Sequence, residues 1–126
     1  LEVTKRPYEK IIAWQEAYKL CILIYKITAD FPNHETFGLR SQIRRASYSV
    51  VLNIVEGNRK KSKKEKIQFF ERSAASLEES HCAAKLSLDL CYITDEQYTE
   101  IDSGVNRTSY LLIKLINSYK ESFTTS

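Results

Sequence analysis

Residues 39–66 read LRSQIRRASYSVVLNIVEGNRKKSKKEK and contain the turn between two expected helices. The first part of the stretch repeats apolar residues at helical spacing, at Leu39, Ile43, Ala46, Val50 and Ile54. Gly57 then predicts the end of this helix, because glycine readily takes the left-handed conformation that closes a helix. Ser62 and Glu65 match the capping box that begins a helix. The stretch therefore predicts a helix from about Glu35 to Gly57, a basic turn and another helix from Ser62.

Two more helices are expected, one on each side of this stretch. Apolar periodicity indicates a helix from about Glu9 to Asp30, and Thr94 with Gln97 forms a capping box before a last helix. The helix from Ser62 carries an apolar row of Ile67, Phe70, Ala74, Leu77, His81, Ala84, Leu88 and Cys91. Short connections between long helices favour antiparallel neighbours. Residues 1–126 are therefore expected to form one all-α domain, an antiparallel up-down-up-down four-helix bundle.

The composition excludes several classes of protein. Hydrophobic residues make up 43% of the chain, which is too many for a disordered protein. No segment has the run of about 18 apolar residues that a membrane span requires. The three cysteines show no paired spacing, which argues against disulfides and a thiolate zinc site. We expect a cytoplasmic protein without a membrane partner, bound metal or other cofactor.

Positive charge is concentrated in residues 39–66, although the formal net charge of the whole chain is only +3. This stretch holds nine Lys or Arg residues and two Glu residues. Lys63 and Lys64 lie in an expected first helical turn, where the helix dipole disfavours cations, so this charge does not serve helix stability. We expect a phosphate-binding surface for nucleic acid, RNA more than DNA. Its predicted residues are Arg40, Arg44, Arg59, Lys60, Lys61, Lys63, Lys64 and Lys66, with Arg40 and Arg44 exposed. A solvated loop that only confers solubility is the alternative.

A polar stripe borders the apolar face of the helix that ends near Gly57. Its members are Gln42, Arg45, Ser49, Asn53 and Glu56. Polar groups beside a core need partners, so we expect a hydrogen-bonded network that holds helix register, with Glu56 paired to Arg45 or to a neighbouring base. A ligand site is the alternative.

The first expected helix carries two apolar stripes. One contains Trp14, Ala17, Tyr18, Cys21 and Tyr25, and the other contains Ile12, Leu20, Leu23 and Ile27. Only one stripe can face the core of a monomer. The stripe of Ile12, Leu20, Leu23 and Ile27 is therefore expected to form a homo-oligomer interface.

No catalytic constellation is recognisable in the sequence. Glu78 and His81 match half of the motif of a bundle di-iron site, but the only other histidine, His34, falls in an expected loop. We expect His81 to be a hydrogen-bonded side chain. Since no glycine-rich phosphate loop or nucleophile with a base is present, the chain is predicted not to be an enzyme and to have no small-molecule substrate.

Several motifs resemble the 23S rRNA intervening-sequence protein family, whose members are also called four helix bundle proteins. The matching pieces include Phe37-Gly-Leu39, Gln42-Ile-Arg-Arg-Ala46, Asn53-Ile-Val-Glu-Gly57 and Asp89-Leu-Cys-Tyr-Ile93. The chain departs from the family at Ala75 and Cys91, where glycine is usual.

The resemblance implies a small helical bundle with no established enzymatic activity. It also implies a homo-oligomer, because a related accessory protein of diversity-generating retroelements forms a basic pentamer that works with nucleic acid. An RNA-binding or ribosome-associated protein is the first functional hypothesis. A protein-interaction scaffold with no nucleic-acid contact is the alternative.

Overall fold

The computed structural model describes residues 4–124, and the side chains of residues 4–121, as an all-helical chain. Its helices are α1 (Ile12–Thr28), α2 (Leu39–Arg59), α3 (Lys63–Asp89) and α4 (Asp95–Thr124). Two short 3-10 turns, η1 (Pro7–Lys10) and η2 (Asn33–Glu35), precede α1 and α2. Within the described range the chain forms no strand, and the all-α prediction is confirmed.

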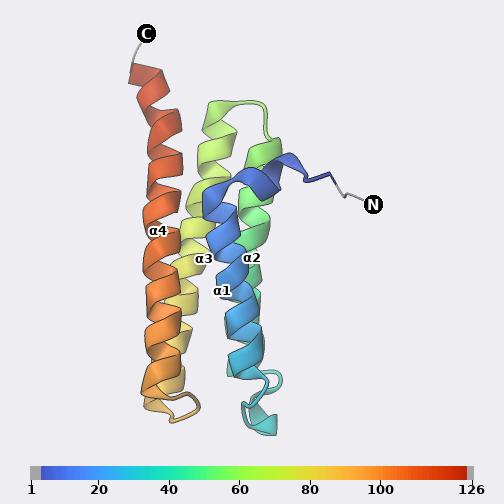
Figure 1. The fold of residues 1–126 in the computed structure, drawn as a ribbon, viewed down its shortest axis with the longest axis vertical. Helices are drawn as coiled ribbons and strands as arrows, with labels where there is room; N and C mark the ends of the chain where they lie inside the picture. The colour runs from blue at the N-terminus through green and yellow to red at the C-terminus, as the bar shows by residue number, and fades with distance from the viewer. Residues whose placement is uncertain (1–3, 125–126) are drawn as a thin grey trace.

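The helices run alternately down and up the long axis of the molecule. In Figure 1 the colour descends along α1, rises along α2, descends along α3 and rises along α4. Each helix packs against two others, in the closed order α1, α2, α3, α4. The arrangement is the expected up-down-up-down bundle. The turn between α2 and α3, η1 and the C-terminal part of α4 all lie at the upper end in this view (Figure 1).

The core runs between the helices and takes side chains from all of them. Its largest fully buried side chains include Ile24, Ile43, Ile54, Phe70, Leu77, Ile101 and Leu112. Burial of such apolar side chains is the main stabilising contribution to a bundle of this kind. On α2 the predicted apolar face is confirmed, with Ile43, Ala46, Val50 and Ile54 buried and Leu39 half-buried.

Two predicted helix starts and two predicted helix ends are wrong, and α1 ends at Thr28 instead of Asp30. Residues before α1 form the separate turn η1, because Ile11 has an extended backbone that interrupts the helix. The second helix begins at Leu39, whose N–H donates to the Glu35 carboxylate at 3.0 Å, so Glu35 lies outside the helix. The same helix continues past Gly57 to Arg59.

Gly57 is required for close packing, not for a left-handed cap. The backbone of Gly57 does not have positive φ. A Cβ placed on it would lie 2.6 Å from Cε1 of the buried Phe70 ring of α3. The glycine therefore lets α2 and α3 approach each other at this level of the bundle.

The two predicted capping boxes differ in the structure. At the start of α4, Gln97 N–H donates to the Thr94 hydroxyl at 3.1 Å, and Thr94 N–H donates to the Gln97 side chain at 2.9 Å, so this box is complete. At the start of α3, Glu65 N–H donates to the Ser62 hydroxyl at 3.1 Å. The Glu65 carboxylate accepts from that hydroxyl and not from the Ser62 N–H, so only the serine half of this box forms.

The buried row of α3 differs from the predicted apolar row. It consists of Phe70, Ser73, Leu77, Ser80, Ala84 and Ser87, whereas Cys91 is exposed. The serines are tolerated because each hydroxyl bonds a backbone carbonyl. Ser73 donates to Val50 of α2 at 2.6 Å, and Ser80 and Ser87 donate to carbonyls of their own helix.

Cys91 ends α3 in the left-handed conformation, with φ of 63°. Its N–H donates to the Leu88 carbonyl at 2.9 Å, and the Tyr92 N–H donates to the Ser87 carbonyl at 2.9 Å. These two bonds form a Schellman motif, whose left-handed position favours glycine. The glycine that is usual here in the resembling family is thereby explained.

Candidate nucleic-acid interface

The basic turn lies at one end of the bundle, where α2 gives way to α3. Arg59, Lys61, Lys63 and Lys64 are exposed there. Lys63 and Lys64 occupy the first turn of α3, as predicted. The turn itself is only residues 60–62, so the charges are held by two helix ends and are not spread along a long loop.

A second basic segment lies beside this turn. Lys5, Arg6 and Lys10 are exposed around η1. Arg6 and Arg59 line the same surface hollow of about 400 Å³, together with Tyr8 and Val55. Lys5 and Arg6 were not predicted as part of the basic surface, because only the folded chain brings this segment to the end of α2. The Lys-Arg-Pro sequence before the first helix was the available signal.

Three lysines of the basic turn, Lys60, Lys63 and Lys66, are engaged in contacts within the protein. Lys66 Nζ donates to the carbonyls of Asn58 at 2.9 Å and Gly57 at 3.4 Å, so it satisfies the last carbonyls of α2. Lys60 Nζ lies 5.0 Å from the centre of the Phe69 ring. Arg59, Lys61 and Lys64 are therefore the residues of this turn that are best placed to contact an external phosphate.

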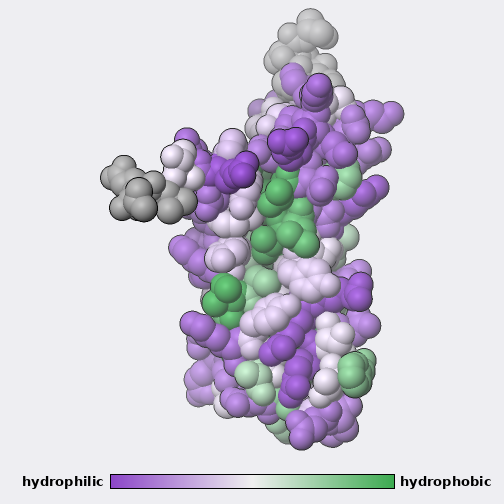
Figure 2. Space-filling view, turned by 90° about the vertical axis from the view of Figure 1, so that its right-hand side faces the viewer, coloured by the Kyte–Doolittle hydropathy of each residue, from purple (hydrophilic) through white to green (hydrophobic). Residues whose placement is uncertain are grey.

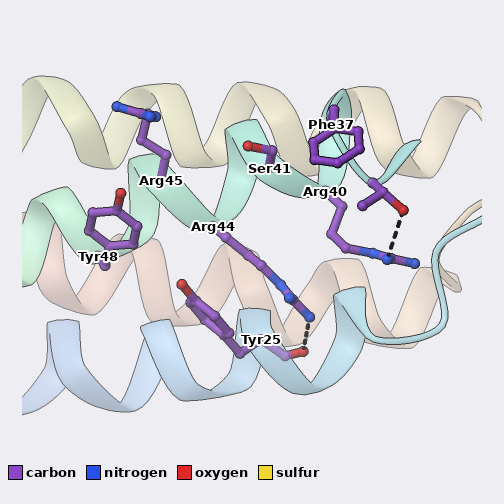
Figure 3. A pocket seen from close by; sticks show the side chains of 8 residues that line it. Tyr25, Phe37, Arg40, Ser41, Arg44, Arg45 and Tyr48 are labelled. Carbon is purple, nitrogen blue, oxygen red and sulfur yellow. Dashed lines mark hydrogen bonds between the residues drawn. The ribbon is translucent and has the colours of Figure 1, made fainter. Parts of the chain in front are cut away.

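Arg40 and Arg44 lie at the other end of α2, and the expectation that both are exposed is wrong. Arg40 Nε donates to the Thr28 carbonyl at 3.1 Å, and its Nη2 donates to the Phe31 carbonyl. Arg44 Nη2 donates to the Tyr25 carbonyl at 3.1 Å (Figure 3). Both guanidinium groups thus cap the negative C-terminal end of α1. The eight predicted basic residues form two separate groups, one at each end of α2.

Glu35 holds the segment between α1 and α2 in place. One carboxylate oxygen accepts from Leu39 N–H, and the other accepts from the Tyr92 hydroxyl at 2.9 Å. These bonds favour the charged carboxylate and lower the pKa of Glu35, the Leu39 N–H contributing most. The bond to Glu35 raises the pKa of Tyr92. The side chain of Tyr92 is also 3.2 Å from His34 Nε2.

The predicted polar stripe of α2 forms only a small network. The amide of Asn53 donates to the carbonyl and hydroxyl of Ser49, and the Ser49 hydroxyl lies 2.9 Å from that of Ser76 on α3. Gln42, Arg45 and Glu56 are exposed. Within residues 4–121, Arg45 and Glu56 make no ion pair with each other, because they lie 11 residues apart in α2, about 16 Å along its axis.

The predicted oligomer stripe of α1 is partly core. Leu20 and Ile27 are 3% and 8% exposed, so they pack inside the subunit and the interpretation of these two residues as an interface is wrong. The face of α1 that enters the core comprises Ala13, Ala17, Leu20, Ile24, Ile27 and Thr28. Ile12 remains 60% exposed, and Leu23 is half-buried.

His81 belongs to a hydrogen-bonded contact between α3 and α4. Its Nε2 lies 2.7 Å from an Asp102 carboxylate oxygen and 3.3 Å from the Tyr98 hydroxyl. In the part of the chain that the structure describes, no three His, Cys, Asp or Glu side chains are grouped so as to hold a metal ion. None of the helices formed by the same residues has the length and hydropathy needed to cross a membrane.

Fold and surface together define a small four-helix-bundle protein with a basic end. Residues 9–114 match the family model of the 23S rRNA-intervening sequence protein. The chain belongs to this family, and the predicted resemblance is confirmed.

A solved structure supports the same fold. It is the crystal structure of a protein of unknown function from the S23 ribosomal protein family of Bacteroides thetaiotaomicron VPI-5482. The two chains are 24% identical and superpose with a TM-score of 0.75, over 83% of this chain and 98% of the other. No curated protein matches the chain.

Proposed function

We propose that the chain is a non-catalytic nucleic-acid-binding protein that contacts the phosphates of RNA through its basic end. The observation that carries this proposal is the meeting of two basic segments, residues 5–10 and 59–64, which are separated by most of α1 and α2 in sequence. A surface of clustered lysine and arginine attracts a polyanion regardless of its sequence. The name of the family, which refers to 23S rRNA, favours RNA over DNA.

Phosphate contacts of this kind position a nucleic acid without reading its bases. Binding should therefore depend strongly on salt. A surface that makes about six phosphate contacts loses roughly a thousandfold in affinity between about 50 and 200 mM salt. A protein-docking scaffold, the alternative function, would not bind RNA in this salt-dependent way.

Charge reversal at the basic end tests the proposal. The triple variant Arg59→Glu, Lys61→Glu and Lys64→Glu should fold, because the three side chains are exposed and a glutamate in the first turn of α3 is favoured by the helix dipole. The matched control reverses three exposed lysines elsewhere, Lys19, Lys26 and Lys85. Fluorescence anisotropy with labelled RNA should show loss of binding and a shallower salt slope for the first variant only. Equal affinities for the two triple variants would exclude the basic end as the binding surface.

We further propose that the protein self-associates through the face shared by α1 and α4. The apolar residue Ile12, which is 60% exposed, lines a hollow there with the half-buried Leu111 and Leu115 of α4. A second copy of the chain would cover this apolar surface. The number of copies can be compared with the pentamer formed by the related accessory protein of diversity-generating retroelements.

Analytical ultracentrifugation tests this association. Ile12→Glu should dissociate the oligomer, whereas Leu86→Glu, at an exposed position of α3, should not. A wild-type protein that sediments as a monomer at micromolar concentration would contradict the proposal.

A further inference from the structure

A second basic hollow lies at the opposite end of α2 from the basic turn (Figure 3). Its volume is about 350 Å³, within the range of small-ligand sites. The side chains that matter are three arginines and three aromatic residues: Tyr25, Phe37, Arg40, Arg44, Arg45 and Tyr48. Neither Asp nor Glu is among the lining residues, so the hollow is suited to an anion.

Two of the three guanidinium groups are held by hydrogen bonds within the protein, and the third is available to a ligand. Arg40 and Arg44 are held by the carbonyls at the end of α1. Arg45 is exposed, and within residues 4–121 its guanidinium makes no hydrogen bond or ion pair. Arg45 can therefore donate two parallel hydrogen bonds to a phosphate, whereas the Arg44 guanidinium points the other way, toward Tyr25 (Figure 3).

Phe37 is an unusual surface residue in this protein. Its side chain is 94% exposed, although phenylalanine is among the residues most often buried. The residues around it are well fixed, since Gly38 N–H donates to the Glu35 carbonyl at 3.1 Å and Leu39 N–H donates to the Glu35 carboxylate. The ring is thus presented to solvent by an ordered turn.

Tyr48 supplies a second aromatic ring, 38% exposed. In Figure 3, Phe37 and Tyr48 lie on opposite sides of Ser41, with Arg44 crossing toward Tyr25 between them. Arg44 covers the face of the Tyr25 ring, at 4.6 Å from its centre. Phe37 and Tyr48 therefore remain the rings that a planar ligand can contact.

The surface between this hollow and the basic turn is not uniformly apolar. Figure 2, which views the molecule from the right-hand side of Figure 1, shows green hydrophobic groups interrupted by purple hydrophilic ones. Single-stranded nucleic acids bind surfaces on which bases stack on aromatic rings and phosphates contact cations, and the rings available here are those of Phe37 and Tyr48.

We propose that this hollow holds one unpaired nucleotide of single-stranded RNA, with the phosphate on Arg45 and the base against Phe37 or Tyr48. The inference rests on the proposed function and adds to it a preference for single strands. A duplex keeps its bases stacked inside the helix, so it cannot offer a base face to Phe37. A single strand can offer a phosphate and the face of an unpaired base at once.

One strand can reach both basic groups. The 21 residues of α2 extend about 30 Å at 1.5 Å per residue. A stacked strand that advances about 3.4 Å per nucleotide covers this length in about nine nucleotides. Binding at one end raises the effective concentration of the strand at the other.

Fluorescence anisotropy with an unstructured RNA of about 12 nucleotides, and with a duplex of the same length, tests the inference. Phe37→Ala should weaken binding of the single strand about fivefold or more and leave the duplex unchanged. Phe37→Leu, which keeps an apolar side chain without a ring, should behave like Phe37→Ala. Arg45→Ala should reduce the salt slope by about one. The control is Tyr110→Ala, which removes a ring that is 61% exposed on α4 and should have no effect.

The outcomes separate this inference from the function on which it rests. If the Phe37 variants bind the single strand like wild type while charge reversal at the basic turn abolishes binding, the nucleotide site is wrong and the proposed function stands. If the wild-type protein binds neither the single strand nor the duplex, the nucleotide site and the proposed function are both wrong. If Phe37→Ala changes the sedimentation coefficient, the hollow is a contact between copies of the chain. If adenosine monophosphate binds as tightly as the strand, the hollow is a site for a free nucleotide, which also overturns the proposal.

Discussion

Substitution of Gly57 by alanine should destabilise the bundle, although alanine is the better helix former. Both neighbours of the added methyl group belong to α3. The new Cβ would lie 2.6 and 2.8 Å from ring atoms of Phe70 and 3.2 Å from Cβ of Phe69. Phe70 is 1% exposed and cannot turn away from the core. The two helices must therefore move apart locally.

The expected magnitude follows from two opposing effects. Replacing glycine by alanine inside a helix gains up to about 1 kcal/mol, and less at Gly57 because the helix ends two residues later. Overpacking of a well-filled core costs about 1 to 3 kcal/mol. The net loss should be about 1 to 2 kcal/mol. For a chain of 126 residues this lowers Tm by about 4 to 8 °C.

Gly104→Ala is the matched control. It is the same substitution at another buried helical glycine, but the added Cβ meets a methyl group of Leu20 at 2.9 Å, the flexible end of its side chain. This variant should be close to wild type or more stable, because Leu20 can adjust while alanine favours the helix. Thermal and urea unfolding followed by circular dichroism measure both variants. Equal Tm changes for Gly57→Ala and Gly104→Ala would refute the packing argument.

Three further predictions concern the helix ends. Cys91→Gly should stabilise the protein by about 0.5 to 1 kcal/mol in urea unfolding, since glycine adopts the left-handed conformation without strain; no gain would mean that the cap is not strained. The lowered pKa of Glu35 means that its stabilising contribution is complete above the ordinary carboxyl pKa and is lost as the pH falls through the folded-state pKa. Wild type should therefore have a higher Tm than Glu35→Gln at pH 7, and the two Tm values should converge in acid. Arg44→Ala should cost about 1 to 3 kcal/mol in urea unfolding, because it removes the charged hydrogen bonds to the Tyr25 carbonyl and the Thr28 hydroxyl; Lys26→Ala, at an exposed position of α1, is the control and should change little.

The helices were predictable because helical period and capping act over a few residues. Thr94 and Gln97 bond each other across three positions, so their role can be recognised without any knowledge of the rest of the fold. Gly57 was misassigned for the opposite reason. The same residue type serves caps and close packing, and only the position of Phe70 decides between them.

The basic turn was predictable because its lysines are contiguous. The role of Arg40 and Arg44 was not, since most of their partners are backbone carbonyls at the end of α1 and at Phe31, 9 to 19 residues earlier in the chain, which carry no side-chain signal. Leu20 and Ile27 were misassigned because α1 is apolar on more than one side. Sequence alone could not decide which stripe faces the core.

The close contact between α2 and α3 has a consequence for the order of folding. These two helices share the most extensive contact of any pair and are joined by only three residues, 60–62. Contacts that are near in sequence form with little loss of loop entropy, whereas α1 meets α4 only after most of the chain has closed on itself. We expect the α2–α3 hairpin to form early and to open last. Hydrogen exchange followed by mass spectrometry should then find the slowest amides in α2 and α3, and its slowest amides in α1 or α4 would contradict this order.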